Sequence, residues 1–182
     1  MKITDVRFYG GARQRVCKLG MTDLYFEVQE IVLSTEVKVL EERNANGGAT
    51  LRKMIDAGFE TREGWVQKKS GGTDWQKRLK YNQSIVVTIG VEVQVSARSD
   101  LIIRDVVHLR NSLQAGEIEV GLIVLPSNQL QVYLPDRTPC LKDALRIIET
   151  EFKEATTYPV VVMAIEHDGP SDTPLPKQKR EA

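Results

Sequence analysis

The sequence predicts an α/β fold in which a central mixed β-sheet is flanked by helices. The main observation is that strand and helix patterns alternate after a central hairpin, which is typical of sheet strands joined by helices. A β-branched strand pattern at 84–95 is followed by a helical pattern at 101–116 and by an apolar strand at 117–125. An amphipathic helix at 139–152 and a strand at 160–165 complete the alternation. We therefore expect one sheet with helices packed against it.

The N-terminal part of the chain predicts one strand and two helices. Residues 3–9 alternate weakly and end at a glycine pair, which indicates a short strand. Apolar residues then recur at helical spacing from Leu24 to Leu40, and the Thr-Asp pair at 22–23 is predicted to cap this helix. After the Asn-Gly-Gly break at 46–48, a second helix is expected at 49–59.

Length and composition indicate one globular domain. The chain has 182 residues, of which 41% are hydrophobic and 27% charged, and we place the domain at residues 1–167. The proline-rich polar segment 168–182 is predicted to be a disordered tail. The first residues do not resemble a signal peptide, and no apolar run approaches the roughly 20 residues that a bilayer needs. We therefore expect a cytoplasmic protein with no membrane partner.

The two cysteines, Cys17 and Cys140, are isolated in the sequence and lack the spacing of metal ligands. Two reduced thiols are the expected state in a cytoplasmic protein, with a disulfide between them as the alternative.

A pair of carboxylates is predicted to meet in the central hairpin. Strand alternation puts Glu92 and Gln94 on the same face of their strand. A second strand at 73–77 precedes the polar turn at 81–84. If the hairpin folds about residue 83, Asp74 lies directly opposite Glu92, with Cβ atoms roughly 4.5–5.5 Å apart. Because two bare carboxylates repel each other at that distance, the spacing indicates a site for a divalent cation.

The charge distribution is uneven although the net charge is zero. The segment 62–110 contains nine basic residues and five acidic residues, so the basic excess surrounds the predicted carboxylates. A polyanionic substrate that approaches an acidic metal site needs such surroundings. An ordinary solvated charged surface is the equal alternative.

The residues around the hairpin resemble a known nuclease family. An acidic residue on one strand, Glu-Val-Gln on the next strand and a following helix resemble the core of the PD-(D/E)XK nucleases. The Arg-Asp pair at 104–105 and the glycine-marked strand at 116–124 narrow the resemblance to the BglII-type restriction endonucleases, in which Glu-x-Gln replaces the commoner Glu-x-Lys. The resemblance covers roughly residues 65–167.

The resemblance implies a PD-(D/E)XK restriction-endonuclease-like core and a set of site residues. Asp74, Glu92 and the next residue, Val93, would contact Mg²⁺, and Gln94 would take the place of the usual lysine. Asn82 is nearer than Asp74 to the usual spacing of the first carboxylate, but Asn82 is neutral and belongs in the turn, so Asp74 is favoured. The expected DNA contacts are Lys77, Arg78, Arg98, Ser99 and Arg104.

The leading functional hypothesis is a type II restriction endonuclease that hydrolyses double-stranded DNA at a specific sequence with Mg²⁺, acting as a homodimer. A nuclease-fold DNA-binding or assembly module that does not cleave is the first alternative, and an α/β interaction domain without a nucleic-acid role is the second. Two structural readings accompany these hypotheses. A polar pair at an exposed sheet edge is the less favoured alternative for Glu92 and Gln94, and His108 is expected to be structural.

Overall fold

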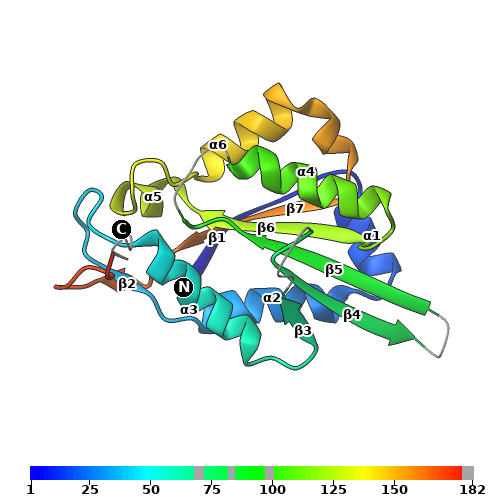
Figure 1. Ribbon diagram of the computed structural model, residues 1–182, viewed down its shortest axis with the longest axis horizontal. Helices are drawn as coiled ribbons and strands as arrows, with labels where there is room; N and C mark the ends of the chain where they lie inside the picture. The colour runs from blue at the N-terminus through cyan, green and yellow to red at the C-terminus, as the bar shows by residue number, and fades with distance from the viewer. Residues whose placement is uncertain (68–71, 82–84, 97–100, 178–182) are drawn as a thin grey trace, which may run out of the picture.

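A six-stranded mixed sheet forms the centre of the protein (Figure 1). The computed structural model describes residues 1–67, 72–81, 85–96 and 101–177. In spatial order the strands are β1 (Lys2–Phe8), β7 (Val160–Glu166), β6 (Val120–Pro126), β5 (Ile85–Val93), β4 (Trp75–Tyr81) and β3 (Trp65–Gln67). The strands β5, β6 and β7 are parallel to one another, and the other three pair antiparallel with their neighbours. The predicted α/β class with a central mixed sheet is confirmed.

Helices cover both faces of the sheet (Figure 1). The helices α2 and α3 lie on one face, and α4 and α6 lie on the other. The α-helices are α1 (Ala12–Lys18), α2 (Thr22–Ser34), α3 (Gly48–Glu60), α4 (Leu101–Gln114), α5 (Asn128–Tyr133) and α6 (Leu141–Arg146). The helix predicted at 139–152 is shorter than expected, because α6 continues as a π-helical turn η1 (Ile147–Glu151) and a 3₁₀ turn η2 (Lys153–Thr157).

Strand alternation divides the hydrophobic core into two clusters. Val91 and Leu122 belong to the cluster beneath α2 and α3, whereas Ile123 belongs to the cluster beneath α4 and α6. Glu92 is paired in register with Ile123. Because paired residues on neighbouring strands point to the same face, the Glu92 side chain is directed toward α4.

The segment after α2 is extended, and this corrects the helix that was predicted to continue to Leu40. The helix ends at Ser34, and β2 (Lys38–Val39) pairs in parallel with β8 (Gly169–Pro170). The Val37 N–H donates to Asp168 Oδ2 at 2.8 Å. Tertiary pairing with a distant segment therefore overrides the helical spacing of Val39 and Leu40.

The C-terminal segment is ordered through residue 177, where composition alone predicted disorder. The carboxamide of the buried Asn46 accepts a hydrogen bond from the Leu175 N–H at 3.0 Å, and the Gly47 N–H donates to the Leu175 carbonyl at 2.9 Å. These two hydrogen bonds pair the backbone N–H and carbonyl of Leu175, which lies outside any helix or sheet. Residues 178–182 lie outside the described residues.

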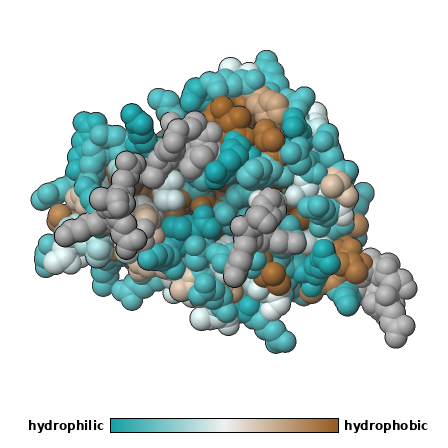
Figure 2. All heavy atoms as spheres, viewed as in Figure 1, coloured by the Kyte–Doolittle hydropathy of each residue, from teal (hydrophilic) through white to brown (hydrophobic). Residues whose placement is uncertain are grey.

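The face of the protein drawn in Figure 2 is mostly hydrophilic and carries separate hydrophobic areas. The exposed apolar side chains include Ile103 of α4. Cys17 is exposed and Cys140 is buried, and both are free thiols, as expected. In the described part of the chain, no helix combines the length and hydrophobicity that a membrane span requires.

Candidate active site

The β4–β5 hairpin has the predicted register. Trp75 pairs with Val91 and Tyr81 with Ile85, so the hairpin is centred on residue 83. The same register brings Asp74, directly before β4, opposite Glu92. Asp74 Oδ2 accepts a hydrogen bond from the Val93 N–H at 2.9 Å, which fixes this carboxylate at the end of β5. Asn82, the alternative to Asp74, lies outside the described residues.

Glu92 is a buried carboxylate in the middle of the sheet. The strand β5 is paired with β4 on one side and β6 on the other, so the alternative of a polar pair at an exposed sheet edge is wrong. Only 3% of Glu92 is exposed. Burial raises the pKa of Glu92 to about 10, and the negative charges of Asp74 and Asp105 add to this increase. Glu92 Oε1 has no hydrogen-bond partner among the described residues.

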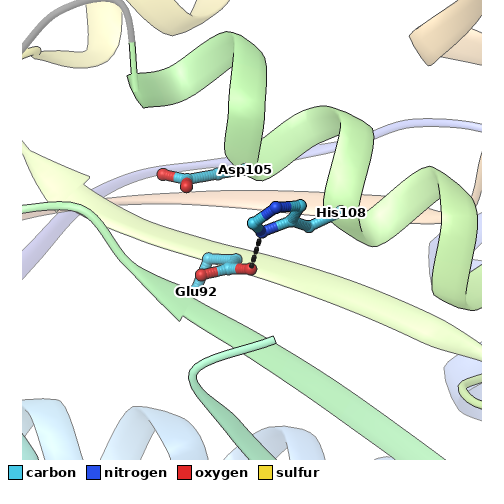
Figure 3. Close-up of side chains that lie close together, drawn as sticks. All are labelled: Glu92, Asp105 and His108. Carbon is cyan, nitrogen blue, oxygen red and sulfur yellow. Dashed lines mark ion pairs between the residues drawn. The ribbon is translucent and has the colours of Figure 1, made fainter. Parts of the chain in front are cut away.

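The helix α4 adds two polar side chains above Glu92 (Figure 3). Asp105 is buried, and His108 Nδ1 lies 3.7 Å from Glu92 Oε1. Burial raises the pKa of Asp105 to about 7, and the charge of Asp74 adds to the increase. His108 was expected to be structural, yet it lies beside the predicted catalytic carboxylate. The available signal was the i,i+3 spacing of Asp105 and His108, which puts both on one face of the helix.

A guanidinium group bridges two of the predicted metal contacts. Arg52 of α3 places Nη1 3.0 Å from Asp74 Oδ2, and the same nitrogen donates to the Val93 carbonyl at 2.6 Å. Asp56 holds Arg52 in place by accepting from Nε at 2.7 Å, and its other oxygen accepts from Trp75 Nε1 at 2.8 Å. Sequence reasoning missed Arg52, because this residue lies far from the hairpin in the chain and reaches the site from another layer.

Gln94 directly follows β5 and is buried. Its backbone N–H donates to the Val124 carbonyl at 2.7 Å, and this bond extends the pairing with β6. The side-chain amide donates to the Ser96 carbonyl at 3.3 Å, which is longer than a usual N–H···O hydrogen bond.

The predicted DNA contacts are divided between the two faces of the sheet. Arg78 is exposed and, by strand alternation, lies on the face of Asp74. Arg104 is exposed on α4, with Nη2 3.7 Å from Asp105 Oδ1. Lys77 points to the opposite face and pairs with Glu27 at 2.7 Å. Lys77 therefore does not belong to this site, because alternation along β4 turns it away from Asp74.

Two of the predicted DNA contacts, Arg98 and Ser99, lie outside the described residues.

The residues present fit a divalent cation. The Asp74 carboxylate and the Val93 carbonyl both contact Arg52 Nη1 at the end of β5, and oxygen atoms of these kinds are the ligands that Mg²⁺ prefers. A buried carboxylate oxygen without a partner, such as Glu92 Oε1, is costly in free energy. A bound cation would remove that cost.

The raised pKa values predict that the metal-free protein loses stability as pH increases. Glu92 and Asp105 bind protons more tightly in the folded state than in the unfolded state. The folded state therefore holds more protons above the ordinary pKa of these groups, and the free energy of unfolding falls as pH rises through about 7. Urea unfolding in a chelator should give a lower free energy at about pH 8 than at about pH 5.

A saturating divalent cation should reduce or reverse this fall, because the cation replaces the protons as the partner of the carboxylates. Glu92→Gln is the control and should show a smaller pH dependence, since it removes one of the two titrating groups. A free energy of unfolding that increases from about pH 5 to about pH 8 in the chelator would contradict the prediction.

The fold and the site together define a restriction-endonuclease-like protein, with a central mixed sheet between helices and acidic side chains at the end of a hairpin. A family model described as Restriction endonuclease BglII/BglIII matches residues 5–165 of the chain. The chain belongs to this family. The match includes part of the N-terminal strand and the helices α1 to α3, which the resemblance from 65 to 167 did not reach. A search of curated proteins found no match.

Proposed function

We propose that the protein is a type II restriction endonuclease that hydrolyses double-stranded DNA at a specific sequence with Mg²⁺. The observation that carries the proposal is the buried Glu92 opposite Asp74 on a hairpin of the expected register, in a chain of this family. Such an enzyme would act in the cytoplasm, where foreign DNA arrives.

Each residue of the site has a proposed role. Asp74, Glu92 and the Val93 carbonyl would hold Mg²⁺. When bound, the ion would activate a water molecule and neutralise the charge that develops on the phosphate oxygens. Gln94 would orient the attacking water through its amide, because it cannot supply the positive charge of the usual lysine. The burial of Glu92 and Gln94 would exclude bulk water there and strengthen the electrostatic interactions of the site.

Arg52 would act as the resident counter-charge of Asp74. Its guanidinium contacts the Asp74 carboxylate and the Val93 carbonyl through one nitrogen. Productive metal binding would require this nitrogen to release both oxygens, and the bond from Nε to Asp56 would keep the side chain close by. A released guanidinium is also a strong phosphate-binding group.

DNA would lie along the face of the sheet that carries α4. Arg78 on β4 and Arg104 on α4 are exposed on this side, so both are proposed phosphate contacts. Phosphate contacts position the protein, whereas base-edge contacts select the sequence.

We expect a homodimer in solution. One small domain carries one cleavage site, and a two-fold symmetric pair would place two such sites on a palindromic sequence. Light scattering at micromolar concentration should give about twice the chain mass of 20.5 kDa, with or without DNA. A monomer under both conditions would count against this prediction.

The proposed function is tested by incubating the protein with unmethylated phage DNA and Mg²⁺, followed by sequencing of the fragment ends. The expected result is a set of discrete fragments that share one terminal sequence, and no cutting in a chelator. Intact DNA under all divalent-cation conditions would contradict the proposal.

A DNA-binding or assembly module without cleavage is the second candidate, and one observation favours it. Arg52 forms an ion pair with Asp74 and donates a hydrogen bond to the Val93 carbonyl. In a protein that does not cleave, the guanidinium would remain there in place of a metal ion. Footprinting separates the two candidates, because this module would protect a DNA fragment in Mg²⁺ without cutting it.

A further inference from the structure

Three potential ligand atoms converge on the α4 side of Glu92 (Figure 3). One such atom from each of Glu92, Asp105 and His108 lies within 4.8 Å of the other two. Asp105 and His108 both point from α4 toward the strand that carries Glu92. This spacing allows a single ion to be held by one strand and one helix.

A second, independent observation points to a missing ligand at the same place. Glu92 Oε1 and Asp105 Oδ2 are buried, and neither has a hydrogen-bond partner among the described residues. The two residues are 3% and 1% exposed. Arg104 approaches only the other oxygen of Asp105, at 3.7 Å. Two buried carboxylate oxygens without partners are costly in free energy, and a cation bound between the two side chains would provide a partner.

This cluster differs from the oxygen-lined site at Asp74. On that side of Glu92, the Arg52 guanidinium already contacts Asp74 and the Val93 carbonyl. On the α4 side, the third ligand is a nitrogen, and the side chain of His108 is 34% exposed, which gives an ion a path from solvent. Glu92 is the one residue that the two sites share.

We propose that Glu92, Asp105 and His108 form a second divalent-cation site, which takes transition-metal ions of the Mn²⁺, Co²⁺, Ni²⁺ and Zn²⁺ class in preference to Mg²⁺. Imidazole suits these ions, whereas Mg²⁺ keeps oxygen ligands and several of its water molecules. Only a role of the bound ion in the reaction on DNA rests on the proposed function. The site itself requires no cleavage.

The test compares Co²⁺ and Mg²⁺ binding by calorimetry, without DNA, in the untagged full-length protein. The chain has two histidines, so His167→Gln is a matched control for His108→Gln. His167 is buried, and its Nδ1 lies 2.9 Å from the Gly169 carbonyl. Wild-type protein and His167→Gln should bind Co²⁺ alike. His108→Gln and Asp105→Asn should bind it at least about tenfold more weakly.

Mg²⁺ affinity should change little in His108→Gln, because Mg²⁺ does not depend on the imidazole. Nuclear magnetic resonance provides a second measurement, in which substoichiometric Mn²⁺ should broaden the ring signals of His108 and leave those of His167 sharp. If Asp105→Asn fails to fold, the partly exposed His108 still provides the test. Equal Co²⁺ affinity in wild-type protein and His108→Gln, with equal broadening of both histidines, would overturn the proposal.

The outcome is separable from that of the proposed function. Cleavage in Mg²⁺ together with Co²⁺ binding that does not depend on His108 would overturn this inference and leave the nuclease function standing. Co²⁺ binding that depends on His108 in a protein that never cuts DNA would support the inference and overturn the nuclease function.

Discussion

Glu92→Gln is expected to abolish DNA cleavage while the fold and DNA binding remain. The substitution removes the charge of the central carboxylate at nearly constant volume. We expect a loss of at least about 10³-fold, because one missing electrostatic contact to a reacting group already costs roughly 10²–10³. Cleavage of a mapped DNA fragment in Mg²⁺ measures the loss, and a gel-shift assay in Ca²⁺ measures binding. Unchanged turnover would rule out Glu92 as a site residue.

The same variant should be at least as stable as the wild type when metal is removed. Glu92 is buried among Asp74 and Asp105, and its raised pKa shows that the folded protein disfavours its charge. An amide has no charge to desolvate, so the unfolding free energy in a chelator at about pH 8 should be equal or higher. Added divalent cation should stabilise the wild type and leave the variant nearly unchanged. A variant that unfolds more easily than the wild type in the chelator would contradict this expectation.

Asp74→Ala is expected to abolish cleavage and weaken Mg²⁺ binding, whereas Asn82→Ala should cut normally. The register of the hairpin carries this expectation, because it brings Asp74 opposite Glu92. Cleavage assays and Mg²⁺ titration followed by calorimetry provide the measurements. An inactive Asn82→Ala together with an active Asp74→Ala would show that the first carboxylate position belongs to Asn82.

Asp74→Asn separates the charge of Asp74 from its structural role. Asp74 accepts the Val93 N–H and pairs with Arg52, so the alanine variant should also lose roughly 1–3 kcal/mol of stability by leaving these groups unpaired. The asparagine variant retains an acceptor for the Val93 N–H, so it should recover part of that stability. It should remain inactive, because an amide oxygen is a weaker metal ligand than a carboxylate. An active Asp74→Asn would mean that the charge is dispensable.

Most of the sheet could be predicted from the sequence, and so could one half of the candidate site. Strand alternation and the polar turn determine the register of β4 and β5, and that register brings Asp74 and Glu92 together. Local sequence patterns predicted the wrong structure where a segment pairs with a distant part of the chain. The segment at 38–39 has helical spacing but forms a strand with 169–170, and hydrogen bonds to Asn46 and Gly47 order a tail whose composition predicts disorder.

The sequence by itself determined the α/β class, the hairpin and the two carboxylates at its end, because strand periodicity and turn chemistry are local properties. Only the tertiary structure decided which side chains surround those carboxylates. Arg52 reaches Asp74 from α3, and Asp105 and His108 reach Glu92 from α4. The spacing of residues along a helix defines which of them share a face, but the packing of that helix on the sheet decides which strand the face meets. That packing depends on the shape of the whole core, which no local stretch of sequence contains.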